Sequence, residues 1–498
     1  MISPLISMQF PLYILLLLLM AAVIIPLTVK ELNLRSRVII ITPLLGAWGM
    51  MLYTFINVLR HGSYLYNIGN WGPKIGIQFN IDLFSTFMSL FILSLSLLII
   101  IYSLRVIEHE IYSPQIPVYY SLLFLLILGM VGITITNDLF NTYVFMEILA
   151  ITSCSIISIK RYKENYLAAY KYLILNTLGS LSFLFGVALL YMVTGYLNFG
   201  EIYIRINEVW TLYSTNLLLA LGLMVTGLAI KAAVFPLHIW LPDAHSSAPT
   251  PSSALLSGLV VKVYIFTAMK LLYRAIGFSI VDAIHIPRFI TYLAVSGIIM
   301  GSVFAIGQKD IKRLLAYSSV AQIGYIVLGF GIGTEQGLSA AMFHVITHGL
   351  MKTLLFLSAG AIIFKTGKRD IRTFQGLGYK MPVTMILFTV GALGMIGIPG
   401  LNGFMSKWYL GFAVLEINQP IYLVIMLFSS FLNAMYYMPI IITAFLMGND
   451  DKKEEMHVED LPRTMLIPMA TIAFLCIVTG FFPQLIMNIV QRAVPTFL

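Results

Sequence analysis

The sequence predicts an all-α polytopic membrane protein with about 14 transmembrane helices. Three observations lead to this class: 59% of the 498 residues are hydrophobic, only 10% are charged, and the mean hydropathy is +0.92. This composition is typical of a chain whose solvent is lipid. The net charge of +9 is spread over short loops rather than gathered on one domain, so a lipid bilayer and not a nucleic acid is the expected surrounding.

Each predicted helix is a largely apolar stretch of about 20 residues or more, which is the length that crosses the hydrocarbon core. No Lys or Arg precedes Lys30, so we interpret the first stretch as a helix rather than a cleaved signal. The predicted spans cover residues 9–29, 38–59, 82–103, 116–136, 139–159, 166–194, 215–241, 251–273, 287–307, 313–333, 336–364, 382–413, 419–447 and 463–490.

Helices 7 and 12 are expected to be discontinuous. Pro236 interrupts the first and is followed by further prolines up to Pro251, whereas Pro399 lies in the glycine-rich segment 391–403 of the second. Proline removes a backbone donor, so the groups it frees at membrane depth must face protein or water. Two such breaks at corresponding positions indicate two inverted five-helix repeats, 116–273 (helices 4–8) and 287–447 (helices 9–13). We expect one membrane domain, 1–498, which ends in a C-terminal helix at 463–490.

Four charged residues lie inside otherwise apolar stretches: Glu147, Lys231, Lys262 and Lys407. A charge at the centre of a bilayer costs roughly 2.5–3.5 kcal/mol on insertion scales, so such residues persist mainly where they face water, an opposite charge or an ion path. The two cysteines, Cys154 and Cys476, are far apart in apolar stretches and indicate no disulfide framework, metal site or other cofactor site.

Basic residues in the loops predict the orientation of the chain. Most of the 30 Lys and Arg residues fall on one side of the predicted spans, which by the positive-inside rule is cytoplasmic, so both termini are expected outside. The five lysines placed within spans are Lys171, Lys231, Lys262, Lys352 and Lys407. We expect a multi-pass protein of a prokaryotic plasma membrane.

Several spaced motifs between residues 80 and 450 carry a family resemblance. They are the segments 145–149 around Glu147, 231–245 from Lys231 to His245, 248–262 ending at Lys262, 313–324, 343–352 and 397–407 ending at Lys407. The chain resembles the antiporter-like subunits shared by respiratory complex I and Mrp-type sodium/proton antiporters. Its length is closest to the D-type member of Mrp antiporters and its relatives in membrane-bound hydrogenase or sulfur-reducing complexes, since larger members carry extra C-terminal helices and a lateral helix. The family's usual Pro-Pro is here Pro399-Gly400.

The resemblance implies ion translocation through Glu147, Lys231, Lys262 and Lys407. Burial favours the neutral form of a lysine and a nearby carboxylate favours the charged form, so a movement of Glu147 relative to Lys231 could make the lysine hold or release a proton. His344 and His348 would bridge the row, and secondary candidates are Lys171, His238, Asp243, His245 and Lys352.

Each of these residues also has a structural alternative. Glu147 and Lys231 could be a fixed ion pair between two helices, and Lys407 could extend to the membrane interface. Lys171 and Lys352 could equally be path residues or structural ones.

The histidines carry alternatives of their own. His344 and His348, at i and i+4, have a spacing that also suits zinc, but no acidic or thiol ligand accompanies them in their span, so we favour a proton relay. His238, Asp243 and His245 either hydrate the path or bind freed backbone groups, and Asp138 is expected to cap the fifth helix.

The expected function is that of a membrane subunit without a catalytic, redox, metal or cofactor site of its own. It would move protons, or exchange protons for sodium, inside an ion-pumping oxidoreductase or a cation/proton antiporter, beside further antiporter-like and small membrane subunits. A self-sufficient transporter of a small solute and a scaffold subunit are the alternatives. The polar loop at 448–462 is expected to be a solvated connector or a contact for a soluble partner.

Overall fold

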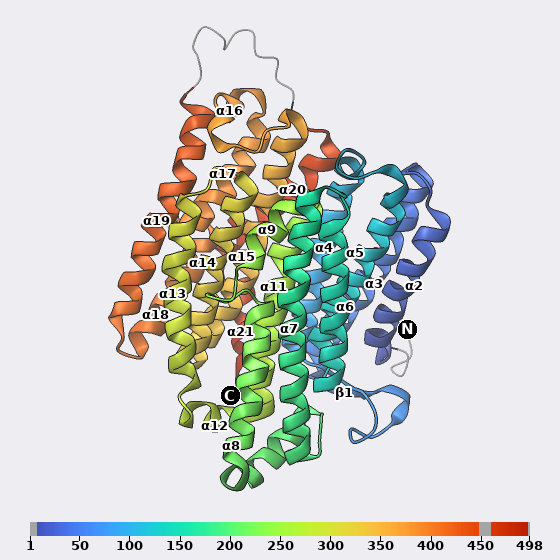
Figure 1. Ribbon diagram of the computed structural model, residues 1–498, viewed down its shortest axis with the longest axis vertical. Helices are drawn as coiled ribbons and strands as arrows, with labels where there is room; N and C mark the ends of the chain where they lie inside the picture. The colour runs from blue at the N-terminus through green and yellow to red at the C-terminus, as the bar shows by residue number, and fades with distance from the viewer. Residues whose placement is uncertain (1–6, 448–459, 497–498) are drawn as a thin grey trace.

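A computed structural model describes residues 7–447 and 460–496, and these residues form a bundle of long helices (Figure 1). Among these residues, thirteen helices are long and apolar enough to cross a membrane, and the broken helix formed by α17 (Pro382–Ile396) and α18 (Asn402–Glu416) supplies a further crossing. The predicted all-α membrane class and the predicted number of spans are therefore confirmed. Most of the proposed 448–462 connector, namely residues 448–459, lies outside the described residues.

The N-terminal part contributes three helices and a small hairpin. The helices are α2 (Phe10–Thr28), α3 (Leu34–His61) and α4 (Leu83–Glu110), and the hairpin pairs β1 (Tyr64–Asn67) with antiparallel β2 (Gln78–Ile81). The hairpin was not predicted, because each of its two strands is only four residues long. Asp82 follows it directly and caps α4 by accepting a hydrogen bond of 2.7 Å from the Ser85 amide.

The next elements contain the first broken span. They are η2 (Ser113–Gln115), α5 (Ile116–Ile135), α6 (Leu139–Ser158), α7 (Lys163–Thr194), α8 (Phe199–Lys231), α9 (Trp240–Ser247), α10 (Thr250–Leu255), the π-helix η3 (Leu256–Val260), α11 (Val261–Met269), the π-helix η4 (Lys270–Gly277) and α12 (Phe278–Ala283). Asp138 caps α6 through the Asn141 amide at 2.7 Å, as predicted. The span from α10 to α12 is almost entirely buried in the centre of the bundle.

The following elements contain the second broken span. They are α13 (Ile286–Ile306), α14 (Ile311–Ile332), α15 (Glu335–Thr366), η5 (Ile371–Thr373), α16 (Leu377–Lys380), α17, α18 and α19 (Pro420–Phe445). Like the span of α10 to α12, α15 is almost entirely buried. These two buried spans contact each other closely at Gly258 of η3 and Thr353 of α15: a Cβ added at Gly258 would lie only 2.4 Å from Thr353 Oγ1.

Two predicted helix boundaries were wrong. The seventh span begins at Phe199 rather than 215, and Asn198 caps this start. The additional N-terminal segment contains the polar residues Glu201, Arg205 and Glu208, and the helix is kinked at Tyr213. The predicted C-terminal helix 463–490 is two helices, α20 (Arg463–Phe481) and α21 (Gln484–Ala493), followed by η7 (Val494–Thr496). Pro483 causes this second division, because a proline disfavours helical backbone at the preceding residue, here Phe482.

The expected placement of two basic residues was also wrong. The predicted spans leave Lys270 and Arg274 at or beyond a helix end, but both lie in η4 within the eighth span. Lys270 is 3% exposed, and Arg274 forms an ion pair of 2.6 Å with Asp82.

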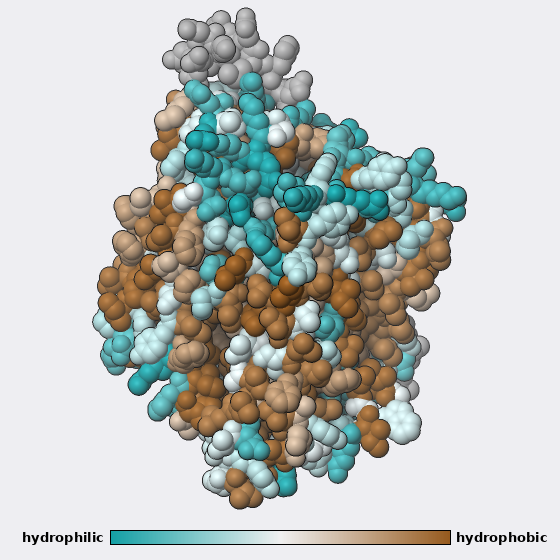
Figure 2. Space-filling model, in the orientation of Figure 1, coloured by the Kyte–Doolittle hydropathy of each residue, from teal (hydrophilic) through white to brown (hydrophobic). Residues whose placement is uncertain are grey.

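Polar and apolar surfaces separate along the long axis of the molecule. Figure 2 shows hydrophobic residues over the flanks and hydrophilic residues gathered at the end that carries α16. The loops at this end contain Lys309–Arg313 and Lys365–Arg372, and we call it the basic face. Both marked chain ends in Figure 1 lie toward the opposite end, which we call the opposite face.

A close contact between the two halves of the second broken span gives a stability prediction. A Cβ at Gly403 would lie 1.9 Å from the Gly394 carbonyl oxygen, so Gly403→Ala must push α18 away from α17 and should cost about 1–3 kcal/mol of stability. Gly222→Ala is the matched control, because that exposed glycine of α8 has nothing within 4 Å of an added Cβ. The midpoint of thermal unfolding in detergent, followed by fluorescence, should fall for the first variant only; equal midpoints would contradict the prediction.

Candidate functional site

The predicted pair of Glu147 and Lys231 forms between α6 and the end of α8. Lys231 Nζ lies 3.5 Å from Glu147 Oε1, and the lysine side chain is fully buried whereas the carboxylate is 28% exposed. Ser180 of α7 donates a hydrogen bond to the same Glu147 oxygen. The distance between lysine and glutamate exceeds that of a good charge-assisted hydrogen bond, so the pair is loose. The Tyr264 ring, 5.6 Å from the ammonium, covers its other side.

The chain breaks directly after Lys231, as predicted from Pro236. Residues 232–239 are not α-helical, and Ala233 has a positive φ of 52°. The Trp240 indole donates to the Ile230 carbonyl at 2.9 Å, which satisfies one of the acceptors left free at the end of α8. His238 stacks on Phe235 with a ring separation of 5.3 Å, so the break is packed on this side.

Lys262 lies in the short helix α11, between two π-helical segments. Its side chain is 1% exposed, and its ammonium donates to the carbonyl of Ser257 in η3. In a π-helix each backbone hydrogen bond spans five residues instead of four, so its turns are wider than those of an α-helix, and such turns are frequent at functional sites. Nothing in the sequence indicated these wide turns.

Helix α15 carries His344, His348 and Lys352 at intervals of four residues, all fully buried. The two imidazole rings are stacked at 5.8 Å. His344 bonds Ser406 through Nδ1 at 2.8 Å and Gln322 through Nε2 at 3.1 Å. Both of its nitrogens are thus occupied, which does not fit a zinc ligand, and among the described residues no group of three or more His, Cys, Asp or Glu is arranged to hold a metal ion.

Two further lysines lie near these histidines, Lys352 on α15 and Lys407 on α18. Lys352 donates to the Leu315 carbonyl at 2.7 Å and to Ser318. Lys407 donates to the carbonyls of Met395 and Ile396, at 2.9 and 3.0 Å, and to Ser430 at 2.9 Å. These carbonyls belong to the last turn of α17, where the helix ends at Gly397 with a φ of 95°. Lys407 therefore binds the acceptors that the break leaves free.

We call the side chains Glu147, Lys231, Lys262, His348, His344 and Lys407 the buried row. The charge of Lys262 acts on both histidines, and the charge of Lys407 acts on His344. Both ring nitrogens of His348 are without a hydrogen-bond partner among the described residues. The row thus runs through the centre of the bundle with unfilled hydrogen-bonding capacity at its middle.

The secondary candidates divide between the centre and the surface. His245 is fully buried, its ring nitrogens lack partners among the described residues, and the charges of Lys262 and Lys352 act on it. Lys171 lies apart from the row, with a side chain that is 57% exposed and paired with Asp243 at 2.8 Å. Arg313 occupies the other oxygen of Asp243.

Three further buried or half-buried charges were missed because the predicted spans place each of them near or beyond a helix end. Lys270 donates to the carbonyls of Ile133 and Thr134 at 3.3 and 3.2 Å, and to that of Thr136, where α5 ends. Lys312 is 3% exposed and donates to the Ala248 carbonyl at 3.1 Å. Glu110, the last residue of α4, pairs with Lys160 at 2.6 Å. In the sequence such positions cannot be told from loop positions.

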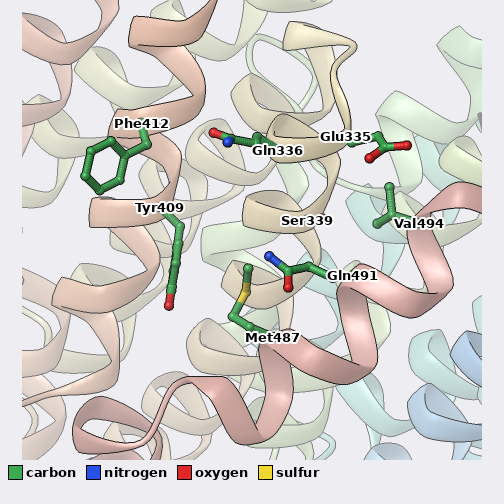
Figure 3. A pocket seen from close by; sticks show the side chains of 8 residues that line it. All are labelled: Glu335, Gln336, Ser339, Tyr409, Phe412, Met487, Gln491 and Val494. Carbon is green, nitrogen blue, oxygen red and sulfur yellow. The ribbon is translucent and has the colours of Figure 1, made fainter.

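Two hollows open beside the end of the row. A groove of about 390 Å³ between α18 and α19 reaches Lys407 and is lined mainly by apolar residues such as Trp408 and Leu427. A second cavity of about 480 Å³ lies between α15, α18 and α21 at the opposite face. Figure 3 shows Gln336, Tyr409 and Gln491 around it, and Ser339, which also lines it, is five residues before His344 on α15.

Comparison with known proteins gives consistent matches. Residues 136–433 match the family described as NADH:quinone oxidoreductase/Mrp antiporter, TM. The chain is 35% identical to NADH-quinone oxidoreductase subunit N of Desulforudis audaxviator over 88% of this chain and 89% of that protein. It is 30% identical to the D-type protein of the Na(+)/H(+) antiporter of Alkalihalophilus pseudofirmus over 90% and 88% of the two chains. A chain in the structure of the membrane-bound sulfane sulfur reductase, an archaeal respiratory membrane complex, superposes with a TM-score of 0.88 at 30% identity over 98% of both chains.

The hydrogen bonds of Lys407 give a prediction about stability. Lys407→Met removes the lysine donor from the Ile396 carbonyl and the Ser430 hydroxyl and leaves the Met395 carbonyl with only the Asn433 amide; an unsatisfied buried group costs about 1–3 kcal/mol, so the unfolding midpoint in detergent should fall clearly. Lys171→Met is the control, because it removes only an exposed ion pair worth about 0–1 kcal/mol. Similar midpoints for both variants would show that the Lys407 contacts are not needed for the break.

Proposed function

The chain belongs to the NADH:quinone oxidoreductase/Mrp antiporter family of membrane subunits, and we propose that it translocates protons, or exchanges protons for sodium, within a multi-subunit membrane complex. The observation that carries this proposal is the buried row, in which titratable side chains follow one another through the centre of an otherwise apolar bundle. Buried charges of this kind are costly and mark ion pathways.

The loose pair of Glu147 and Lys231 is the switch of the proposed mechanism. At 3.5 Å the ammonium is close enough to be stabilised by the carboxylate, yet no hydrogen bond fixes the two groups together. Approach of Glu147 would favour the protonated lysine, and withdrawal would favour release of the proton toward Lys262 and the histidines. His348, with both nitrogens free of partners in the described part of the chain, can accept and pass on a proton.

Both ends of the buried row reach the sides of the molecule, which supports partner subunits at these places. Glu147 is 28% exposed, and Lys407 lies in the groove between α18 and α19. A charged group at the lipid-facing side of a helix is costly unless another protein covers it. We propose that further antiporter-like and small membrane subunits of the complex contact these two sites.

The cavity between α15, α18 and α21 supports release at the opposite face. Its lining combines apolar side chains with the amides of Gln336 and Gln491 and the hydroxyls of Ser339 and Tyr409, and Ser339 is five residues before His344 on α15. Polar groups of this kind hold water, and water carries protons between side chains that do not touch.

The two alternative functions are less well supported. A scaffold subunit would need its charges in tight pairs, whereas Lys231 is loosely paired and His245 and His348 are unpaired among the described residues. A transporter of a small solute would need a central chamber, whereas the two larger hollows beside the row lie at its edge.

We further propose that residues 116–273 and 287–447 are two inverted repeats of one membrane domain. In each, the fourth of five spans is broken, at Pro236 between α8 and α9 and at Pro399 between α17 and α18. Each break adjoins a lysine of the row, Lys231 or Lys407. Broken helices related in this way are a recurrent basis for ion sites near the bilayer midplane.

Substitution in the switch tests the proposed function. Lys231→Ala and Glu147→Gln should lower proton or sodium translocation by at least tenfold in vesicles that contain the assembled complex, because each removes one half of the pair. Lys171→Met, which alters an exposed ion pair outside the row, should transport normally. Ion-sensitive dyes would report the gradient, and normal transport by an assembled Lys231→Ala complex would refute the proposal.

We also propose a prokaryotic plasma membrane location with the basic face in the cytoplasm and both termini outside. In a cysteine-free background, Lys368→Cys on the basic face and Arg288→Cys near the opposite face place single thiols at exposed positions. A membrane-impermeant maleimide added to intact cells should label the second cysteine, whereas inverted vesicles should label the first. The reverse pattern would require the opposite orientation.

A further inference from the structure

A second carboxylate and lysine pair lies at the basic face, outside the buried row. Both Glu110 oxygens accept from the Thr250 amide, at 3.2 and 3.0 Å, and one also accepts from Lys160. The charge of Glu110 acts on Lys312 of α14, which is 3% exposed. The side chains of Lys160 and Glu110 are 18% and 15% exposed, so the cluster reaches from the surface to a buried ammonium.

The ammonium of Lys312 makes one hydrogen bond among the described residues. It carries three N–H groups, and it donates to the Ala248 carbonyl oxygen at 3.1 Å. Ala248 ends the helix that carries His245, three residues earlier, and the charge of Lys312 acts on that imidazole. His245 is fully buried without a partner for either ring nitrogen in the described part of the chain, and the charges of Lys262 and Lys352 act on it too.

We propose that Lys312 is a proton-carrying residue that connects the basic face with His245 and so with the buried row, and that Glu110 is its positioning residue. The inference rests on the proposed proton translocation and names the place where protons enter or leave on this side. A proton on Lys312 passes to a ring nitrogen of His245, and the neutral amine then takes another proton from the water that reaches Glu110 and Lys160.

Other charged groups at this face are less suited to the same role. Both oxygens of Asp243 are held by cations, Lys171 and Arg313. Asp310 pairs with Arg369 at 2.8 Å. Asp370 lies in the loop after α15, outside the membrane-spanning segments. Hydrogen bonds from Arg372 lower the pKa of Asp370 to about 2, so this carboxylate stays ionised. Besides Glu110 and Lys160, Arg369 and Asp310 are the charged groups that act on Lys312.

A purely structural role is the competing explanation, in which Lys312 only satisfies the carbonyl at the end of α9. Arginine separates the two roles, because it keeps the positive charge and the donors but does not release its proton at physiological pH. Lys312→Arg should therefore assemble and yet transport protons at least tenfold more slowly than the wild type. Lys309→Arg, three residues away on the exposed surface, is the matched control and should transport normally.

A second variant changes the partner instead of the lysine. Glu110→Gln retains an acceptor for the Thr250 amide but removes the negative charge near Lys312. The pH on the basic face at which transport is half-maximal should then move down by roughly one unit, because the ammonium has lost a nearby anion. This variant remains informative if arginine does not fit at position 312.

Both variants are measured in sealed vesicles that contain the assembled complex, with the wild type and Lys231→Ala beside them. Normal transport by Lys312→Arg would overturn the role of Lys312. So would a Glu110→Gln variant whose transport falls only in proportion to the amount of assembled complex while its pH profile is unchanged. Normal transport by Lys231→Ala would instead overturn the proposed function itself. The two failures are thus distinguished in one experiment.

Discussion

Buried lysine ammonium groups and the backbone carbonyls of interrupted helices satisfy each other's hydrogen-bonding requirements in this fold. A break or wide turn at membrane depth leaves backbone carbonyls without donors, and a lysine in lipid needs acceptors. Lys262 binds a carbonyl of η3, Lys270 binds those at the end of α5, and Lys407 binds those at the end of α17. Lys231 differs, because its closest anionic partner is a carboxylate at 3.5 Å and its ammonium makes no hydrogen bond in the described structure. The one lysine of these four that is not anchored to backbone is the one best able to change its proton occupancy.

The same constraint applies to the polar side chains of the central spans. The span from α10 to α12 and helix α15 are almost fully buried, so their polar side chains have protein on all sides and cannot reach water at an interface. A polar group there can bond only to protein neighbours, as His344 bonds to Ser406 and Gln322. His348 has no such partner among the described residues. The outer helices, such as α2 and α19, have instead many exposed apolar side chains.

Hydrophobic length and proline positions were enough to predict the number of spans and the two breaks, whereas the pairing of Glu147 with Lys231 was expected from the family resemblance. Lys270, Lys312 and Glu110 were missed for a physical reason: the predicted spans place them near or beyond a helix end, where the sequence does not reveal whether a neighbouring helix covers the side chain. The exposure of Lys171 is the converse case, because an apolar stretch predicts a span but not which of its faces is turned outward. The wide turns η3 and η4 contact α15 and α8, respectively, and no pattern in the residues indicated them.

Those wide turns have a mechanical consequence for Lys262. The nine residues of α11 are held between two segments that each contain more backbone per turn than a regular α-helix. Moving one surplus residue from one segment to the other would rotate α11 about its own axis by about 100° while the ends of the span stay in place. Lys262 therefore lies on a short helical segment that such a shift would rotate relative to the surrounding helices.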